Sequence, residues 1–391
     1  MNKKIIKESL PSAEKKEIKL GYMRLSDSSP LILAQELGLF GKYDLTVTLK
    51  REVSWANIRD KIITGALDAS QMLAPMPLVT TLGAAGIRAP IITGLALSLN
   101  GNGITLSPVL WKTLSNHIEN CGSPYFKRRS QTEYLKRNQQ VTFATVHPFS
   151  THTLLLRIWL KARGIDPDRD VKIIVLPPEQ MVDSLAQGVI DGFCAGEPWN
   201  SIAVDYGVGV LAANGSQIWH NATEKVLGVL EDWHFKNPAT HLRLRLALME
   251  ACEWLDDMNN RELAVKVISR PEYLDIPEHN LRPSLIGKNI YNRGQGLPNH
   301  QILSKFNAGF PWRSQAEFML KECETLLGKK IDQSKISSIT QQCYRTDLYR
   351  EAARQLNIAA PDSDYKTETI SDQFLEINDE MNNSENPRTH H

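Results

Sequence analysis

Residues 141–160 of the chain read Val-Thr-Phe-Ala-Thr-Val-His-Pro-Phe-Ser-Thr-His-Thr-Leu-Leu-Leu-Arg-Ile-Trp-Leu. The first six of these residues are mostly apolar or β-branched, which predicts a short buried strand. His147-Pro148 ends this strand, because proline donates no backbone hydrogen bond and restricts the residue before it. Ser150 and Thr151 are favoured N-cap residues, and apolar residues then recur at helical spacing. The stretch is therefore predicted to be a strand, a polar turn and a helix.

The turn from this strand into the helix is a candidate anion site. A helix N-terminus presents unpaired backbone N–H groups and the positive end of the helix dipole. Thr151 and His152 are expected in the first turn, where a cationic side chain disfavours the helix. His152 is therefore expected to be neutral or to have an anion beside it. An ordinary solvated histidine at a helix start explains this stretch equally well.

Strands and helices alternate along most of the chain, which predicts an α/β fold with mostly parallel sheets and flanking helices. The expected strands cover residues 17–23, 45–51, 67–72, 88–99, 141–146, 170–176, 190–195 and 207–212. Helices are expected over residues 30–38, 55–64, 75–82, 151–163 and 178–188, and later over 242–258, 262–268, 314–326 and 345–356.

The order of these elements indicates two α/β lobes that form a hinged clamp. Residues 98–107 are extended and rich in Gly and Asn, so they are expected to cross from one lobe to the other. The strand at 207–212 is expected to return the chain. The predicted organisation is an N-terminal extension (1–17), lobe 1 (18–104 and 213–360, with C-terminal helices), lobe 2 (105–212) and an acidic disordered tail (361–391). A ligand would lie between the lobes, as in periplasmic-binding-protein-like (type II) clamps.

Composition narrows the class of protein. The 391 residues are 42% hydrophobic and 23% charged, which is ordinary for a globular protein. A formal net charge of +1 argues against direct nucleic-acid binding as the main activity. The five cysteines include no C-x-x-C pair, so neither a disulfide framework nor a zinc site is predicted, and they fit a reducing compartment.

The N-terminal residues carry the prediction of location. Residues 1–19 are rich in lysine and lack the apolar core and cleavage site of a secretory signal. No apolar run approaches the roughly 18 residues of a membrane span, so no membrane association is expected. If Met1 is the natural start, the protein is expected to be cytoplasmic. A signal removed before this Met is the alternative.

Several other residues at strand–helix turns are candidate ligand-binding groups. Trp55 follows a capping Ser54, and its indole N–H or ring face suits a small planar ligand, whereas a core Trp is the alternative. Asn102 lies between two glycines and offers amide donors, or it is simply a turn residue. Gly196 and Glu197 follow a buried strand and precede a helix start. The loop would direct backbone N–H groups into the cleft, with Glu197 orienting a neighbouring cation; a surface loop is the alternative.

Lys225 enters an apolar, strand-like segment, although from this sequence alone a solvated surface lysine is the stronger interpretation. The sequence contains no G-x-S-x-G, H-E-x-x-H, P-loop or G-x-G-x-x-G motif placed after a strand. His147 and His152 are poorly spaced for a shared metal. We therefore expect no catalytic activity, no cofactor and no metal.

Four motifs resemble those of the NrtA–CmpA family of nitrate/bicarbonate-binding proteins, the solute receptors of ABC importers. They are Ser54-Trp-Ala-Asn-Ile-Arg-Asp60, Gln71-Met-Leu-Ala-Pro-Met-Pro-Leu78, Ser98-Leu-Asn-Gly-Asn-Gly-Ile-Thr-Leu-Ser107 and Asp191-Gly-Phe-Cys-Ala-Gly-Glu-Pro-Trp-Asn200. The resemblance runs from about Ile18 to Ala360. It implies that an anion site lies at or near Trp55, Asn102, His152, Gly196 and Lys225. The family's Gly-Gly-Thr-His turn appears here as Phe149-Ser150-Thr151-His152.

The N-terminus, without an evident secretory signal or anchor, resembles the cytoplasmic nitrate/nitrite sensors of the NasS type. This resemblance implies a protein partner, an RNA-binding antiterminator (NasT-like) that is held inactive until the anion binds. The function expected is therefore a nitrate/nitrite sensor that regulates nitrate assimilation. The alternative is a nitrate or bicarbonate solute-binding component of an ABC importer whose signal peptide has been removed.

Overall fold

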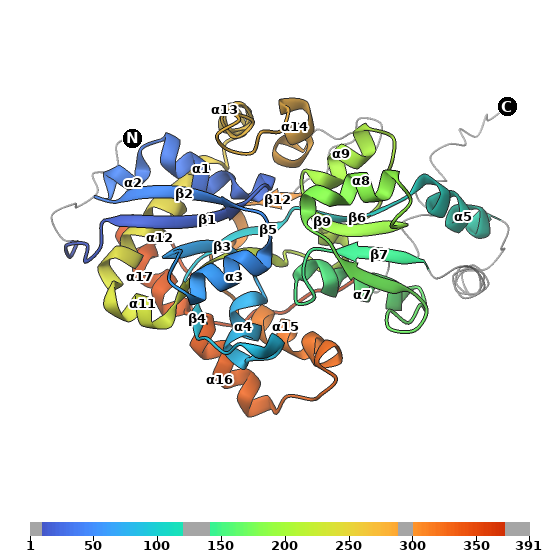
Figure 1. The fold of residues 1–391 in the computed structure, drawn as a ribbon. Helices are drawn as coiled ribbons and strands as arrows, with labels where there is room; N and C mark the ends of the chain where they lie inside the picture. Colours follow the sequence, from blue (N-terminus) through green and yellow to red (C-terminus); the bar gives the residue numbers. More distant parts are fainter. Residues whose placement is uncertain (1–9, 120–140, 288–299, 372–391) are drawn as a thin grey trace, which may run out of the picture.

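The computed structural model describes residues 10–119, 141–287 and 300–371, which form an α/β protein with two lobes (Figure 1). Residues 141–160 have the predicted strand, turn and helix. Strand β7 (Thr142–Thr145) is followed by helix α7 (Thr151–Ala162). The Ser150 hydroxyl caps this helix by accepting a hydrogen bond from the Thr153 N–H at 3.1 Å.

The larger lobe is built on a seven-stranded sheet of order β12-β5-β11-β3-β1-β2, with β4 paired to β11. Its strands are β1 (Glu17–Met23), β2 (Thr46–Glu52), β3 (Ala69–Leu73), β4 (Ile91–Ile92), β5 (Ala96–Asn100), β11 (Thr223–Leu230) and β12 (Gln301–Ile302). Strand β1 runs parallel to β2 and β3, whereas β11 is antiparallel to β3, β4 and β5.

The smaller lobe has a five-stranded sheet of order β10-β6-β9-β7-β8. Its strands are β6 (Asn102–Leu106), β7, β8 (Lys172–Val175), β9 (Gly192–Gly196) and β10 (Val210–Asn214). Strands β7, β8 and β9 pair in parallel, whereas β6 pairs antiparallel with both β9 and β10. Both sheets are therefore mixed. Strands β5, β6 and β11 adjoin the connections between the lobes, and every antiparallel pair among the described strands includes one of them.

The chain passes between the lobes where β5 gives way to β6, as the Gly- and Asn-rich segment predicted. The return differs from the prediction. The segment expected to carry the chain back was 207–212, but its last three residues belong to β10, which pairs within the smaller sheet. The chain instead returns through residues 215–222, between β10 and β11. A sequence pattern of alternating apolar residues predicts that a strand forms, but it does not predict which sheet the strand joins.

Helices pack around both sheets (Figure 1). Those of the larger lobe are α1 (Ser29–Glu36), α2 (Leu39–Lys42), α3 (Trp55–Ile63), α4 (Met76–Leu82), α11 (Glu231–Lys236), α12 (Pro238–Trp254), α13 (Met258–Ile268), α14 (Glu278–Ile286), α15 (Arg313–Leu327), α16 (Gln333–Cys343) and α17 (Thr346–Leu356). Those of the smaller lobe and the return connection are α5 (Pro108–Glu119), α7, α8 (Met181–Ala186), α9 (Trp199–Asp205) and α10 (Gly215–Ile218).

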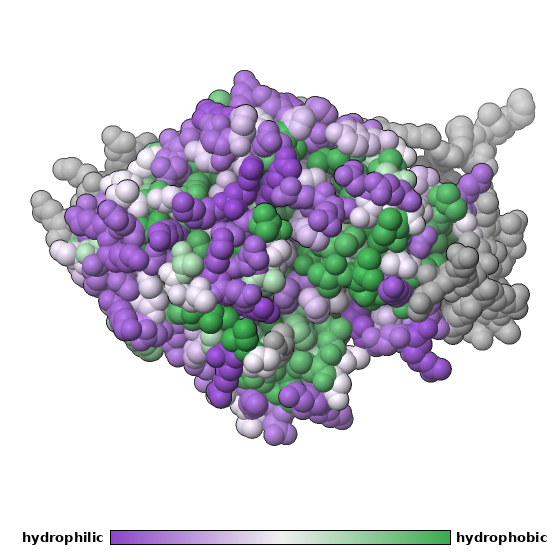
Figure 2. Space-filling model, viewed as in Figure 1, coloured by the Kyte–Doolittle hydropathy of each residue, from purple (hydrophilic) through white to green (hydrophobic). Residues whose placement is uncertain are grey.

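Hydrophilic side chains cover most of the face seen in Figure 2, and hydrophobic side chains gather over part of the smaller lobe. Among the described residues, no helix combines the length and apolar character that a membrane crossing requires.

The sequence-based expectation about the C-terminal tail is corrected for its described part. The tail from 361 was expected to be disordered, but its described part, 361–371, is bonded to the larger lobe. The Arg350 side chain donates to the Pro361 carbonyl at 2.9 Å, and Arg350 pairs with Asp364 at 2.7 Å. Hydrogen bonds and ion pairs of charged residues attach this segment to the larger lobe, although it contains few apolar side chains that could pack there. Residues 372–391 lie outside the described residues.

The predicted N-terminal extension also packs in its described part. The Glu14 carboxylate accepts hydrogen bonds from the N–H groups of Ala239 and Thr240 at 3.1 and 2.9 Å. These N–H groups belong to the first turn of α12, whose N-cap residue makes no side-chain cap of its own. A carboxylate in this position satisfies donors that a helix start leaves unpaired.

Asp68 joins three segments of the larger lobe and is 7% exposed. Its carboxylate accepts from the Lys15 ammonium (2.6 Å), the Lys19 backbone N–H (2.9 Å) and the Trp233 indole (3.1 Å). We expect Asp68→Ala to lower the free energy of unfolding by about 1–3 kcal/mol, because it leaves donors unpaired. Urea denaturation followed by circular dichroism measures this change.

The matched control for this prediction is Asp232→Ala, which removes an exposed carboxylate that pairs with the equally exposed Lys236. Exposed pairs of this kind contribute about 1 kcal/mol or less. Equal losses of stability for the two variants would contradict the structural role of Asp68.

Candidate functional site

Two adjacent buried residues at the start of β11, Glu224 and Lys225, form the centre of the candidate site. Both side chains are completely buried. Successive side chains of a regular strand point to opposite faces of a sheet. Here the register of β11 against β5 shifts on both sides of Lys225. Such an irregularity redirects side chains, and it lets Glu224 and Lys225 come together.

The Lys225 ammonium lies between two carboxylates. Its Nζ is 2.7 Å from Glu224 Oε1 and 2.8 Å from Asp27 Oδ2. The ring centre of Trp55 lies 5.3 Å from the same nitrogen, within the range of a cation–π contact. Lys225 is therefore not a solvated surface lysine, and the interpretation that the sequence alone favoured is wrong.

Glu224 extends this cluster to the smaller lobe. Its Oε1 lies 3.0 Å from His152 Nε2, and its Oε2 accepts from Asn102 Nδ2 at 2.5 Å. His152 comes from the first turn of α7 and Asn102 from the start of β6. Both are buried, so the solvated-histidine interpretation is also wrong. One carboxylate of the larger lobe thus holds two side chains of the smaller lobe.

Gly196 and Thr151 lie beside the cluster. A Cβ atom placed on Gly196 would be 3.6 Å from His152 Nε2 and 3.8 Å from Lys225 Nζ, so the backbone of Gly196 faces both side chains. The Thr151 hydroxyl donates to the Thr223 carbonyl at 3.4 Å, which is a further bond between the lobes. The structure therefore brings together six of the predicted residues: Trp55, Asn102, Thr151, His152, Gly196 and Lys225.

Glu197 has different partners from the other six. Its Oε2 accepts from the backbone N–H and hydroxyl of Ser201, at 3.1 and 2.8 Å, and its Oε1 lies 3.2 Å from His300 Nε2. Its backbone carbonyl accepts from the Ser26 N–H of the larger lobe at 2.9 Å. The neighbouring side chain that Glu197 contacts is thus an imidazole, and the predicted roles of Glu197, orienting a cation and binding an anion, stay predictions.

Sequence reasoning did not place Glu224 or Asp27 in the site. Asp27 and Ser28 precede α1 and are residue types that often cap helices, but the N-cap Ser28 makes no side-chain bond to that helix. The Ser28 hydroxyl donates instead to Gln71 Oε1 at 2.8 Å, and Gln71 Nε2 donates to Asp27 at 2.7 Å. The one available signal for Glu224 was its place beside Lys225 in an apolar strand.

The buried charged groups change one another's pKa values. Burial alone would raise the pKa of Glu224, but the neighbouring His152 and Lys225 outweigh it and lower this pKa to about 2. Burial raises the pKa of Asp27, although the Lys225 charge opposes the shift. Burial would lower the pKa of Lys225, but Asp27 and Glu224 outweigh that effect and raise it. Lys225 is therefore a fixed cation.

Several polar atoms in the cluster have no hydrogen-bond partner among the described residues. They include the Trp55 indole N–H, His152 Nδ1 and Asn102 Oδ1. Buried polar groups are normally satisfied, so unpaired ones in one cluster indicate a place where a polar ligand binds. An anion can accept from the indole N–H and pair with the Lys225 cation.

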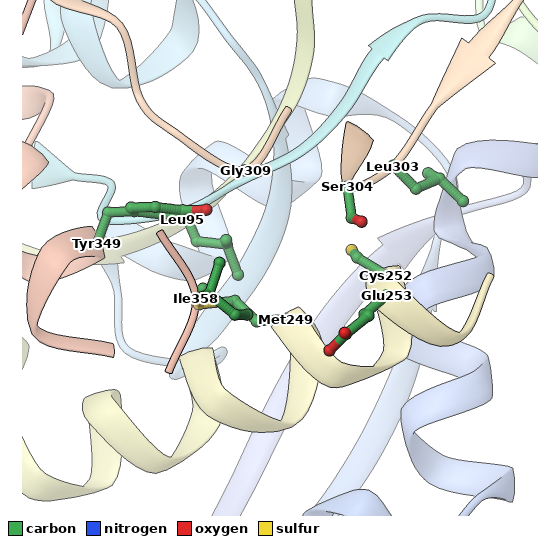
Figure 3. Close-up of a pocket in the computed structure, with 9 residues that line it drawn as sticks. All are labelled: Leu95, Met249, Cys252, Glu253, Leu303, Ser304, Gly309, Tyr349 and Ile358. Carbon is green, nitrogen blue, oxygen red and sulfur yellow. The ribbon is translucent and has the colours of Figure 1, made fainter. Parts of the chain in front are cut away.

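A separate cavity of about 110 Å³ lies in the larger lobe and shares no lining residue with this cluster (Figure 3). It is lined by Leu95, Met249, Cys252, Glu253, Leu303, Ser304, Gly309, Tyr349 and Ile358. The single charged group in that lining is a carboxylate, which repels anions. Across the described parts of the chain, no three His, Cys, Asp or Glu side chains gather as a metal site.

Comparison with known proteins gives relatives across nearly all of the chain. Residues 11–269 match the model of the NMT1-like family. The nitrate import ATP-binding protein NrtC of Synechocystis sp. strain PCC 6803 is 36% identical over 367 residues, covering 92% of this chain and 53% of NrtC. The chain spans about half the length of the first curated relatives it matches.

Two further relatives match over most of their own length. The bicarbonate-binding protein CmpA of Synechococcus sp. strain PCC 6301 is 31% identical, covering 92% of this chain and 83% of CmpA. The crystal structure of the periplasmic nitrate-binding protein NrtA from Synechocystis PCC 6803 superposes with a TM-score of 0.84 at 30% identity, covering 93% of this chain and 95% of NrtA. The chain therefore belongs to the NMT1-like family, in which its relatives include nitrate- and bicarbonate-binding proteins.

Proposed function

We propose that this chain is a non-catalytic receptor that binds nitrate or nitrite between its two lobes. The observation that carries the proposal is the buried Lys225 cation beside the unpaired indole N–H of Trp55 and the unpaired Nδ1 of His152. Nitrate is a planar monoanion with acceptor oxygens and no donor, so it suits N–H groups and a fixed cation. The names of the relatives NrtA and CmpA support an anion of this class.

The cluster is completely enclosed, so an anion can reach it only when the lobes separate. Contacts that close the two lobes run through Glu224, which binds His152 and Asn102 across the gap. An anion that binds here competes with Glu224 for the side chains that hold the lobes together. Anion binding and the relative position of the lobes are therefore coupled.

We extend the proposal to a cytoplasmic sensor that regulates nitrate assimilation. In this role the anion-dependent lobe position decides whether a protein partner, a NasT-like RNA-binding antiterminator, is held. The resemblance to NasS-type sensors supports this role and supplies the partner. Pull-down of such an antiterminator in the absence of nitrate and in a saturating excess of nitrate tests it. Release of the partner by nitrate is expected, and equal capture in both conditions contradicts the sensor role.

The second candidate is a solute-binding component of an ABC importer. The relatives include import ATP-binding proteins and a periplasmic nitrate-binding protein, which favours this candidate. Both candidates use the same anion site. They differ in the partner, an antiterminator for the sensor and membrane transport subunits for the importer.

Removing the Lys225 cation is expected to abolish tight nitrate binding. Removing one member of a buried charged pair costs about 2–5 kcal/mol, which corresponds to a loss of affinity of about 30-fold or more. Isothermal titration of Lys225→Ala with nitrate and nitrite measures this loss. Near-wild-type affinity in a folded Lys225→Ala protein would contradict the proposed site.

Lys225→Ala leaves Asp27 and Glu224 without their cation, so it also threatens folding. The double variant Asp27→Asn with Lys225→Met removes one charge of each sign and keeps both shapes. It is expected to keep the fold and still lose nitrate. Thermal unfolding of each variant separates a lost site from a lost fold.

Glu224 also makes bicarbonate a candidate ligand. A carboxylate repels nitrate, but it can accept the O–H of bicarbonate. Glu224→Gln removes the charge and keeps the shape, so its effect distinguishes the two anions. If nitrate is the ligand, its affinity is expected to rise by several-fold in Glu224→Gln, on the order of 1 kcal/mol of relieved repulsion.

If bicarbonate is the ligand, Glu224→Gln is expected to lower its affinity, because a neutral amide is a weaker acceptor than a carboxylate. Titration of the unmodified protein and of Glu224→Gln with nitrate and with bicarbonate shows which anion is the ligand. Weaker nitrate binding by Glu224→Gln would contradict the nitrate proposal.

Nitrate binding is also expected to strengthen as pH falls from 8 to 6. The charges of Lys225 (+1), Asp27 (−1) and Glu224 (−1) sum to −1. A bound anion favours a proton on this cluster, and burial has already raised the pKa of Asp27. Uptake of one proton per anion raises affinity up to about tenfold for each pH unit of decrease.

Calorimetry in two buffers of different ionisation enthalpy counts the protons taken up. Asp27→Asn is the control, since it removes one carboxylate from the sum and is expected to flatten the dependence. Affinity that falls as the pH is lowered would contradict a net negative site.

A further inference from the structure

The last described residues of the chain, 364–371, bind the connection through which the chain returns between the lobes. The His220 N–H donates to the Thr369 carbonyl, and the Ser371 N–H donates to the Ile218 carbonyl, each at 3.0 Å. Between them Trp219 and Ile370 form an antiparallel bridge. In Figure 1 this red segment runs from the larger lobe toward the smaller one. It therefore adds a short strand-like contact to the return connection.

The carboxylate of Glu368 anchors this segment with three donors. Its Oε2 accepts from the Trp219 indole at 3.0 Å and from Gln315 Nε2 at 3.1 Å, and its Oε1 accepts from the Ser314 hydroxyl at 2.7 Å. Trp219 and Gln315 are completely buried. A charged acceptor with several donors makes strong hydrogen bonds, so Glu368 holds both the connection and the start of α15.

Gln315 continues the contact to the anion site. Its Oε1 accepts from the Thr223 N–H at 2.8 Å and from the Thr223 hydroxyl, and its Nε2 donates to the Asn221 carbonyl at 2.8 Å. Thr223 is the first residue of β11 and directly precedes Glu224. Glu368 thus holds Gln315, Gln315 holds Thr223, and Thr223 fixes the backbone from which the central carboxylate and Lys225 extend.

We propose that residues 364–371 are a latch on the return connection and that Glu368 is a positioning residue for anion binding. The latch holds the irregular start of β11, where a regular strand would turn Glu224 and Lys225 to opposite faces. Release of the latch frees this backbone, so the anion leaves faster. The coupling to affinity rests on the proposed anion binding, whereas the hold on the backbone does not.

Hydrogen–deuterium exchange of the full chain tests the hold on the backbone. Glu368→Ala is expected to speed exchange at residues 218–224 about 3- to 30-fold, and Glu368→Gln, which retains an acceptor oxygen, is expected to restore part of the protection. The matched control is Thr367→Ala, an exposed residue of the same segment. Unchanged exchange at 218–224 in Glu368→Ala would overturn the latch.

Truncation separates the latch from the residues after it. A chain ending at Ser371 keeps the latch, and a chain ending at Ser363 removes it. The shorter chain is expected to bind nitrate or bicarbonate about 3- to 30-fold more weakly, through faster dissociation measured by stopped-flow fluorescence. The longer one is expected to match the full chain.

The two parts of the proposal fail in different ways. The variants could lose thermal stability while hydrogen–deuterium exchange at 218–224 and the rate of anion dissociation stay unchanged. In that case Glu368 has only a structural role, and the positioning role is overturned. If neither anion binds even the full chain, the proposed function fails, and exchange at 218–224 still decides whether the latch exists.

Discussion

The buried carboxylate of Glu224 is the interaction on which the rest of the site depends. It holds the Lys225 ammonium on its own strand and the His152 and Asn102 side chains of the other lobe. A buried charge is costly unless it is paired and hydrogen-bonded, and each of these partners offsets that cost. The same carboxylate therefore stabilises the closed lobes and sets the charge that an incoming anion meets.

The backbone near this carboxylate has two features that allow its contacts. An irregular register brings two adjacent β11 side chains to one place. Close packing also makes Gly215 necessary, since a Cβ there would lie 1.7 Å from Asn102 Oδ1. A larger residue at 215 would displace the amide that reaches Glu224. Asn102 and Glu224 lie next to the two connections between the lobes, where a change in lobe position moves side chains directly.

Both described ends of the chain support this architecture with charged side chains. Glu14 caps α12 in the larger lobe, and Glu368 reaches the return connection. Neither segment contributes a large apolar surface, yet each supplies a carboxylate to donors that would otherwise lack a partner. Hydrogen bonding to charged groups explains how polar ends of low hydrophobicity become ordered parts of the fold.

The sequence by itself determined the α/β alternation, the strand–turn–helix at 141–160 and the residue types suited to an anion. These follow from periodicity and capping, which depend on neighbours in the chain. Only the tertiary structure decided that β10 stays in the smaller sheet, that Asp27 pairs with Lys225 instead of capping α1, and that Glu224 lies at the centre. Sheet membership, a bulged register and partners across a lobe boundary arise from contacts distant in sequence, and no local pattern records them.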